Sequence, residues 1–200
     1  CVIRKEQCSF GWDWGPRFAT SGIYLPIRIE ARPAWRIAGV NVRQVHAPGK
    51  VKLSLVPTLD GRAGKGLAWR SRISYGNKIV SESNSLHLAI PNPKLWWPNG
   101  LGRQPLYTLS VELLHKGVVV DTWTRRIGLR TIKLDRHKDQ WGQSFRFVVN
   151  GVPVFAKGAN WVPGHSFQAS VTPQIFEDTL QSAVDAHMNI IRVWGGGVYE

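Results

Sequence analysis

The sequence predicts a mainly β chain in three pieces: the end of a β domain, an immunoglobulin-like β-sandwich and the opening of a (β/α)8 barrel. Three observations carry this prediction. A strand pattern lies near the amino end, short apolar–polar alternations recur through the middle, and a strand–helix–strand pattern follows them. Two hundred residues with 43% hydrophobic content can bury a core of this kind.

The first piece covers residues 1–32. Cys1-Val2-Ile3 is typical of a strand, and Gly22–Glu30 alternates isoleucines with charged residues, which predicts a half-buried strand. A complete domain needs many more residues, so we expect the chain to begin inside this domain.

The middle piece covers residues 33–138. Its apolar residues alternate with polar ones in short runs, of which Val51–Leu55, Leu86–Ile90 and Tyr107–Leu113 are the clearest. About seven strands in roughly 100 residues favour an immunoglobulin-like sandwich. There is no Cys…Trp…Cys pattern, so the piece is not an antibody-type domain.

The third piece covers residues 139–200. Asn150-Gly151 between two apolar stretches predicts a hairpin. Thr172 as N-cap and Pro173 at the first helical position predict a helix, which an apolar strand at Ile190–Trp194 follows. A strand–helix–strand unit with an apolar second strand favours parallel pairing, and we expect a (β/α)8 barrel that is cut after its second strand.

The net charge of +13 first suggests a nucleic-acid binder, but the basic residues are dispersed. The densest cluster follows an alternating strand pattern, which predicts a solvated sheet face; it comprises Arg125, Arg126, Arg130, Lys133, Arg136 and Lys138. The sequence contains no run of eighteen apolar residues, so no membrane span is predicted. We therefore expect neither nucleic acid nor a membrane as a partner.

Cys1 and Cys8 are the only cysteines, and they are not expected to bridge because they lie seven residues apart on an extended segment. Neither belongs to a CxxC motif, and the six histidines show no HExxH pattern or i, i+4 pair. The sequence therefore predicts no metal and no cofactor.

Aromatic and polar residues gather at three places where a ligand could bind. In Gly11–Pro16 the indoles of Trp12 and Trp14 flank Asp13, and indole faces beside a carboxylate suit a sugar ring with its hydroxyls. A tryptophan-rich turn can equally fill a core. Two predicted barrel strands end at Asn160-Trp161 and at Trp194, where barrel enzymes place their sites. Asn160 or Trp161 could instead be a plain turn residue.

Two further features lie near the last predicted strand. Gly195–Gly197 lacks the Lys-Ser/Thr pair and the helix start of a phosphate loop. Arg192 sits in an apolar strand, so we expect it to be buried and paired with a carboxylate.

Together these strings resemble β-mannosidases of glycoside hydrolase family 2, relatives of β-galactosidase and β-glucuronidase. The resemblance covers essentially the whole chain in the family's order. The matching strings are Arg4–Cys8 with Gly11–Pro16, Leu95–Gly100, Arg126–Thr131, Val149–Pro153, Lys157–Pro163 and Arg192–Glu200. The Trp-Asp-Trp-Gly-Pro and Arg-Val-Trp-Gly-Gly-Gly strings indicate the mannosidase branch.

The resemblance implies that residues 1–32 end a galactose-binding-like jelly-roll domain. It also implies that Trp12 and Asp13 reach the barrel mouth, with Asp13 on the hydroxyls of a terminal mannose. Trp194 would line the same subsite, and Asn160 and Trp161 are second candidates for it. The expected substrates are β-mannosides or mannose-terminated oligosaccharides.

The family retains configuration with two glutamates, and the resemblance implies that both lie beyond residue 200. Glu200 itself does not match either position and is expected to be structural. This chain would then supply substrate-binding residues and no catalytic pair. The alternatives are a β-glucuronidase or β-galactosidase specificity within the family, or a non-catalytic carbohydrate-binding module.

Overall fold

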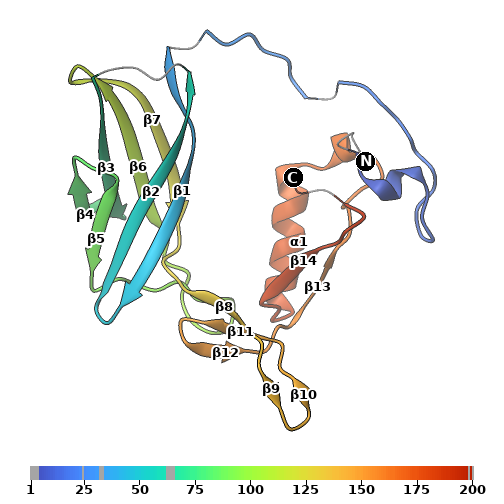
Figure 1. Ribbon diagram of the computed structural model, residues 1–200. Helices are drawn as coiled ribbons and strands as arrows, with labels where there is room; N and C mark the ends of the chain where they lie inside the picture. The colour runs from blue at the N-terminus through green and yellow to red at the C-terminus, as the bar shows by residue number, and fades with distance from the viewer. Residues whose placement is uncertain (1–4, 24, 32–33, 62–65, 198, 200) are drawn as a thin grey trace. The chain divides into compact units, whose positions relative to one another are not determined.

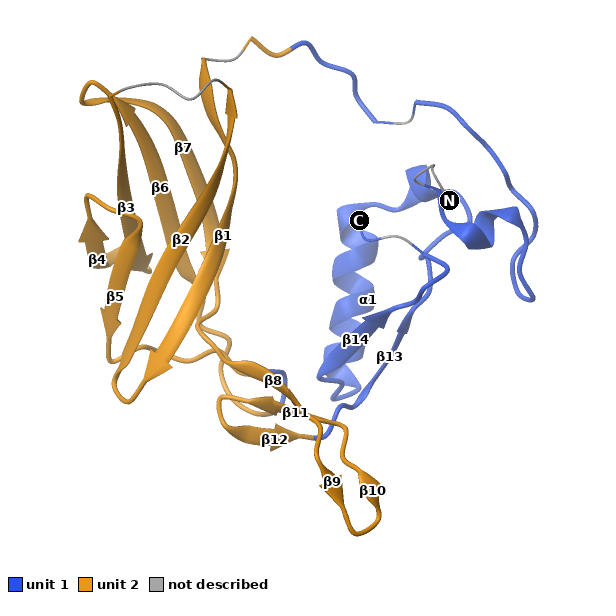
Figure 2. Cartoon of the chain, in the orientation of Figure 1, with its two compact units in different colours: residues 1–29, 98–100, 155–200 blue, residues 30–97, 101–154 orange. Residues whose placement is uncertain are grey.

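The computed structural model describes residues 5–23, 25–31, 34–61, 66–197 and 199. Two compact units divide the chain (Figure 2). Unit 1 comprises residues 1–29, 98–100 and 155–200, and unit 2 comprises residues 30–97 and 101–154.

The two largest sheets of unit 2 are both antiparallel (Figure 1). One sheet has the order β1-β2-β5, with β1 at Trp35–Ala47, β2 at Lys50–Gly61 and β5 at His87–Pro91. The other has the order β4-β3-β6-β7, with β3 at Leu67–Tyr75, β4 at Lys78–Ser83, β6 at Tyr107–His115 and β7 at Val118–Ile127. The mainly β structure expected from the alternating runs is therefore confirmed.

One apolar core joins both sheets of unit 2. Alternate residues of β2 and β6 are buried, because successive side chains of a strand point to opposite faces. Leu53, Ile73, Leu109, Val111 and Leu113 are completely buried. The apolar faces predicted from Val51–Leu55, Leu86–Ile90 and Tyr107–Leu113 supply most of this core.

The basic cluster lies mostly in solvent, as its alternating pattern predicted. Arg125 and Arg126 on β7 are exposed, whereas Arg130 is half-buried. The Arg130 guanidinium lies over the Trp96 ring, 4.5 Å from its centroid. This cation–π contact partly covers the Arg130 guanidinium, whereas the other five residues of the cluster are exposed.

A smaller sheet follows in unit 2, with the order β12-β11-β8 and strands at Ile132–Asp135 (β8), Arg146–Val149 (β11) and Val152–Val154 (β12). The Asn150-Gly151 hairpin is confirmed, with φ of 50° and 83° at its two central residues, which is the left-handed pair that a tight hairpin turn needs. The Asn150 side chain accepts from Thr131 N–H and donates to the Trp96 carbonyl. A short hairpin of β9 (Lys138–Asp139) and β10 (Gly142–Gln143) lies between β8 and β11.

Unit 1 contains a parallel strand–helix–strand unit, as predicted. Strand β13 (Gly158–Trp161) pairs in parallel with β14 (Ile190–Val193), and helix α1 (Pro173–Asp185) connects them. The N-cap is confirmed, since the Thr172 hydroxyl accepts from Ile175 N–H and Pro173 opens the helix. The Asn99 amide donates to the carbonyls of Val184 and Met188, which anchors residues 98–100 at the end of α1.

The strand expected over Gly22–Glu30 is wrong. The described residues of this stretch adopt no strand, and Ile27 and Ile29 are exposed by 77% and 101%. An extended chain becomes a stable strand only where a neighbour supplies hydrogen bonds, and no sheet of the described residues includes this stretch. The strand predicted at Cys1–Ile3 lies outside the described residues.

Candidate functional site

The Trp12–Gly15 segment forms a tight turn at the amino end of unit 1. Trp12 and Gly15 exchange two backbone hydrogen bonds, of 3.0 and 3.2 Å, which places Asp13 and Trp14 at the two central positions. A short 3₁₀ helix, η1 at Gln7–Phe10, leads into it, and Phe18 N–H bonds back to the Ser9 carbonyl at 2.9 Å. The loop therefore holds an exposed carboxylate between two half-exposed indoles.

The second part of the site is the carboxyl edge of the parallel pair β13 and β14. Both strands end there, with Trp161 beside Val193 and Trp194 directly after. The Trp194 N–H donates to the Trp161 carbonyl at 3.0 Å, which continues the ladder by one step. The two strand ends predicted as site positions thus meet at one edge, where α/β folds bind ligands.

Three indoles from the two parts come together. The Trp194 ring lies 5.1 Å from the Trp12 ring and 6.0 Å from the Trp14 ring, measured between centroids, with interplanar angles of 72° and 63°. These are edge-to-face contacts, the arrangement that the ring quadrupole favours. Trp12, Trp14 and Trp194, called the indole cluster below, unite residues from distant parts of the chain.

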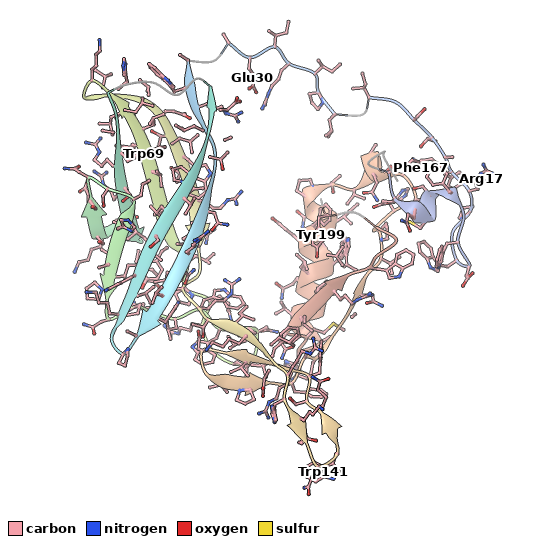
Figure 3. The ribbon with its side chains drawn as sticks, in the orientation of Figure 1. Arg17, Glu30, Trp69, Trp141, Phe167 and Tyr199 are labelled. Atoms are coloured by element: carbon pink, nitrogen blue, oxygen red, sulfur yellow. The ribbon has the colours of Figure 1, made fainter. Side chains whose placement is uncertain are left out.

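A backbone bond fixes the same junction. Cys8 N–H donates to the Gly196 carbonyl at 3.3 Å, so the segment before the tryptophan turn is tied to the glycine loop after β14. A second contact lies nearby, where the rings of Phe18 and Phe167 stack at 4.8 Å (Figure 3, which labels Phe167). The turn is therefore held to the strand ends by main-chain and aromatic contacts.

Asn160 and Trp161 separate to opposite faces of the β13–β14 pair. In register, Asn160 lies beside Arg192, whose guanidinium donates to Asn160 Oδ1 at 3.0 Å. Trp161 points to the other face and stacks on Phe176 of α1 at 5.3 Å. Asn160 is thus available on the face away from the helix, whereas the Trp161 ring packs against the helix.

The burial expected for Arg192 is wrong. Its side chain is exposed, and the partner that the structure gives it is the Asn160 amide oxygen rather than a carboxylate. The apolar neighbours that suggested burial lie on the strand itself, and side chains of alternate residues leave on opposite faces.

Cys8 and Glu6 lie buried beneath the tryptophan turn, 7% and 3% exposed. Burial, and secondarily the nearby Glu6 carboxylate, raises the pKa of the Cys8 thiol. A protonated thiol is a poor nucleophile, so Cys8 acts as a small apolar residue here. A cavity of about 300 Å³ adjoins these two residues, with Trp14, Phe18 and His165 also in its wall.

Two site features were missed from the sequence. Trp14 belongs to the indole cluster, although only Trp12 and Asp13 of the turn were expected to contact sugar. Cys8 and Gly196 join the two parts through their backbones. The Trp-Asp-Trp motif placed the Trp14 indole beside Asp13 but did not show that it meets Trp194, and no sequence signal marks a backbone hydrogen bond.

Within the described ranges, no group of three His, Cys, Asp or Glu side chains is arranged to hold a metal ion. The helices of that same part of the chain are too short or too polar to cross a bilayer.

Comparison with known proteins decides the family. Residues 40–130 match the model of glycosyl hydrolases family 2, and residues 1–25 match that of the glycosyl hydrolase 2 galactose-binding domain-like region. The chain belongs to glycoside hydrolase family 2. Among family 2 relatives, a β-mannosidase of Rattus norvegicus is 35% identical over 99% of this chain and 24% of its own length. The chain thus spans about a quarter of the length of the curated relatives it matches.

Solved structures agree with the family 2 assignment. The crystal structure of a β-D-mannosidase from Dictyoglomus thermophilum is 38% identical, with a TM-score of 0.91 over 98% of this chain and 26% of that chain. A β-glucuronidase from Ruminococcus gnavus reaches a TM-score of 0.64 over 80% of this chain and 26% of that chain, at 16% identity, and so shares the fold.

Proposed function

We propose that this chain is part of a retaining exo-β-mannosidase, and that it supplies one wall of the subsite for the terminal mannose. The indole cluster carries the proposal. It joins the tryptophan turn to the carboxyl edge of two parallel strands, so an apolar aromatic surface and the Asp13 carboxylate meet where a sugar ring can bind.

Each side chain of the proposed subsite has a defined task. The Asp13 carboxylate accepts hydrogen bonds from two neighbouring hydroxyls of the mannose ring, and the indoles of Trp12 and Trp194 cover apolar C–H surface. Asn160, held by Arg192, offers an amide at the neighbouring strand end. Trp161 contributes by packing α1 against the strands, and we assign it no sugar contact.

The proposed domain order follows the family. Residues 1–32 would close a jelly-roll domain, residues 33–138 would form an immunoglobulin-like sandwich, and residues 139–200 would open a (β/α)8 barrel. Two antiparallel sheets around one core support the second assignment. The parallel β13–α1–β14 unit supports the third.

Hydrolysis itself requires a pair of carboxyl groups about 5–5.5 Å apart, one as acid and base and one as nucleophile. We propose that both belong to barrel strands beyond residue 200. The 200 residues by themselves would then bind sugar at most weakly and hydrolyse no glycoside. Turnover of an aryl β-mannoside by this stretch, surviving the change Glu200→Gln, would contradict that assignment.

The test of the activity is a substrate panel on the full-length protein. We expect kcat/KM for an aryl β-mannoside to exceed those for the matching β-glucuronide and β-galactoside by at least about 100-fold. β-Mannosidase relatives at 35 to 38% identity support this preference, against 16% for the β-glucuronidase structure. A preference for the β-glucuronide would establish the alternative specificity. Binding of mannosides without hydrolysis would indicate a carbohydrate-binding module.

A further inference from the structure

Gly196 lies directly behind the Trp194 indole. A Cβ atom built on Gly196 would stand 2.8 Å from Cε3 of Trp194 and nearer still to Cζ3 and Cη2. Real Cβ atoms keep at least about 3.4 Å from ring carbons in ordinary contact. The indole therefore occupies the space that any side chain at position 196 would need.

The three consecutive glycines are not equivalent. A Cβ atom on Gly195 would meet nothing within 4 Å, and one on Gly197 would touch the Pro163 ring at 3.3 Å. Gly196 is absent from the glycines with positive φ, so its backbone conformation is open to other residues. Space for the Trp194 ring, rather than backbone freedom, is what position 196 requires.

Gly196 is also fixed in place. Gly196 is buried, and its carbonyl accepts a hydrogen bond from Cys8 N–H. The next residue closes a tight turn, because Gly197 N–H donates to the Trp194 carbonyl at 3.1 Å. The clash that a larger residue creates would therefore fall on the far end of the Trp194 side chain, which can rotate, and not on the loop.

We infer that Gly196 is a positioning residue for the sugar site, acting through Trp194. The missing side chain lets the indole fold back against its own loop, and in this orientation it meets the edges of Trp12 and Trp14. Adding a methyl group at position 196 swings the indole out of the cluster and removes the apolar wall from the mannose subsite. The kinetic part of this inference rests on the proposed function; the orientation of the ring does not.

The experiment compares neighbouring glycines in the full-length protein. Gly196→Ala should lower kcat/KM for an aryl β-mannoside by about 10- to 100-fold, because displacements of about 1 Å in a site cost that much. Gly195→Ala, which adds the same methyl group into open space, should stay within about twofold. The ring is followed by the ¹⁹F resonance of 5-fluorotryptophan at position 194, assigned by its loss in Trp194→Phe. This resonance should shift in Gly196→Ala and stay in place in Gly195→Ala.

Replacing Trp194 with the smaller phenylalanine distinguishes an effect of Gly196 on the ring orientation from an effect on folding. In the Trp194→Phe background the phenyl ring leaves room for a methyl group, so Gly196→Ala should cost no further activity there. An equal loss in both backgrounds would mean that Gly196 acts through the fold and would overturn the inference. The inference would also be overturned if Gly196→Ala matched Gly195→Ala in both kcat/KM and the position of the ¹⁹F resonance. Should Gly196→Ala not fold, a folded double variant supports the inference and an unfolded one refutes it.

The two proposals fail in different ways. If Trp194→Ala keeps the kcat/KM of the unaltered protein, Trp194 is not a wall of the sugar site. The ¹⁹F shift in Gly196→Ala still decides whether Gly196 sets the ring orientation.

Discussion

The indole of Trp12 stands edge-on to the indole of Trp194, with ring centroids 5.1 Å apart and planes inclined at 72°. The two residues come from opposite ends of the chain. Their contact joins the tryptophan turn, which carries Asp13, to the carboxyl edge of the parallel strands within unit 1.

Asp13→Asn should lower kcat/KM for β-mannosides roughly 30- to 1,000-fold, on the order of 2–4 kcal/mol of transition-state stabilisation. The amide keeps the shape of the side chain and loses the charge that strengthens its hydrogen bonds to hydroxyls. Asp13 is exposed, so the melting temperature should not change. The exposed Asp60 on β2 gives the matched control, Asp60→Asn. Activity and melting temperature falling together would make Asp13 a scaffold residue.

Trp194→Ala and Trp161→Ala should differ in their effects on activity and stability, although both residues lie at the carboxyl ends of the parallel strands β13 and β14. Trp194→Ala should reduce kcat/KM by an amount comparable to Asp13→Asn. It should cost less stability than Trp161→Ala, because the Trp12 and Trp14 rings that it contacts are themselves exposed. Trp161→Ala should destabilise unit 1 by about 1–3 kcal/mol, because its half-buried ring stacks on Phe176 of α1. Chemical denaturation and steady-state kinetics on both variants measure this. A reversed pattern would move the sugar wall from Trp194 to Trp161.

Asn150→Ala should destabilise unit 2 by about 2–3 kcal/mol. The change removes two side-chain hydrogen bonds, to Thr131 N–H and the Trp96 carbonyl, and puts alanine at a φ of 50°. Asn77→Ala in the turn between β3 and β4 is the control, because Asn77 is exposed and lacks a positive φ. Equal midpoints of urea unfolding for the two variants would show that the Asn150 bonds do not contribute.

Acidification should destabilise unit 2 through His46. Burial lowers the pKa of His46 below its ordinary value, and its Nε2 lies 3.0 Å from Gln44 Oε1. The unfolded chain therefore takes up a proton at about pH 6.5, before the folded chain does, so stability falls between that pH and the lower folded pKa.

His46→Gln should reduce this dependence, whereas His87→Gln, at an exposed position on β5, should leave it intact. The measurement is the free energy of unfolding between about pH 7.5 and about pH 5. If the free energy of unfolding of His46→Gln falls with pH as steeply as that of the unaltered protein, other groups cause the pH dependence.

The sequence alone determined most of the local structure. Alternating residues such as Val51, Leu53 and Leu55 predicted strands because a sheet with one buried face imposes a period of two. Asn150-Gly151 and Thr172-Pro173 predicted a turn and a helix start, because these residues satisfy the backbone locally. The same local logic failed at Gly22–Glu30, where alternation is present but no described strand pairs with it.

Only the tertiary structure decided which aromatic side chains belong together. Trp161 and Trp194 follow similar strands, yet one packs on α1 and the other meets Trp12 and Trp14. Strand periodicity fixes the face from which a side chain leaves, but the partner on that face comes from a distant segment. For the same reason the sequence showed three glycines after β14, while the space for the Trp194 ring at Gly196 appeared only once the indole was in place.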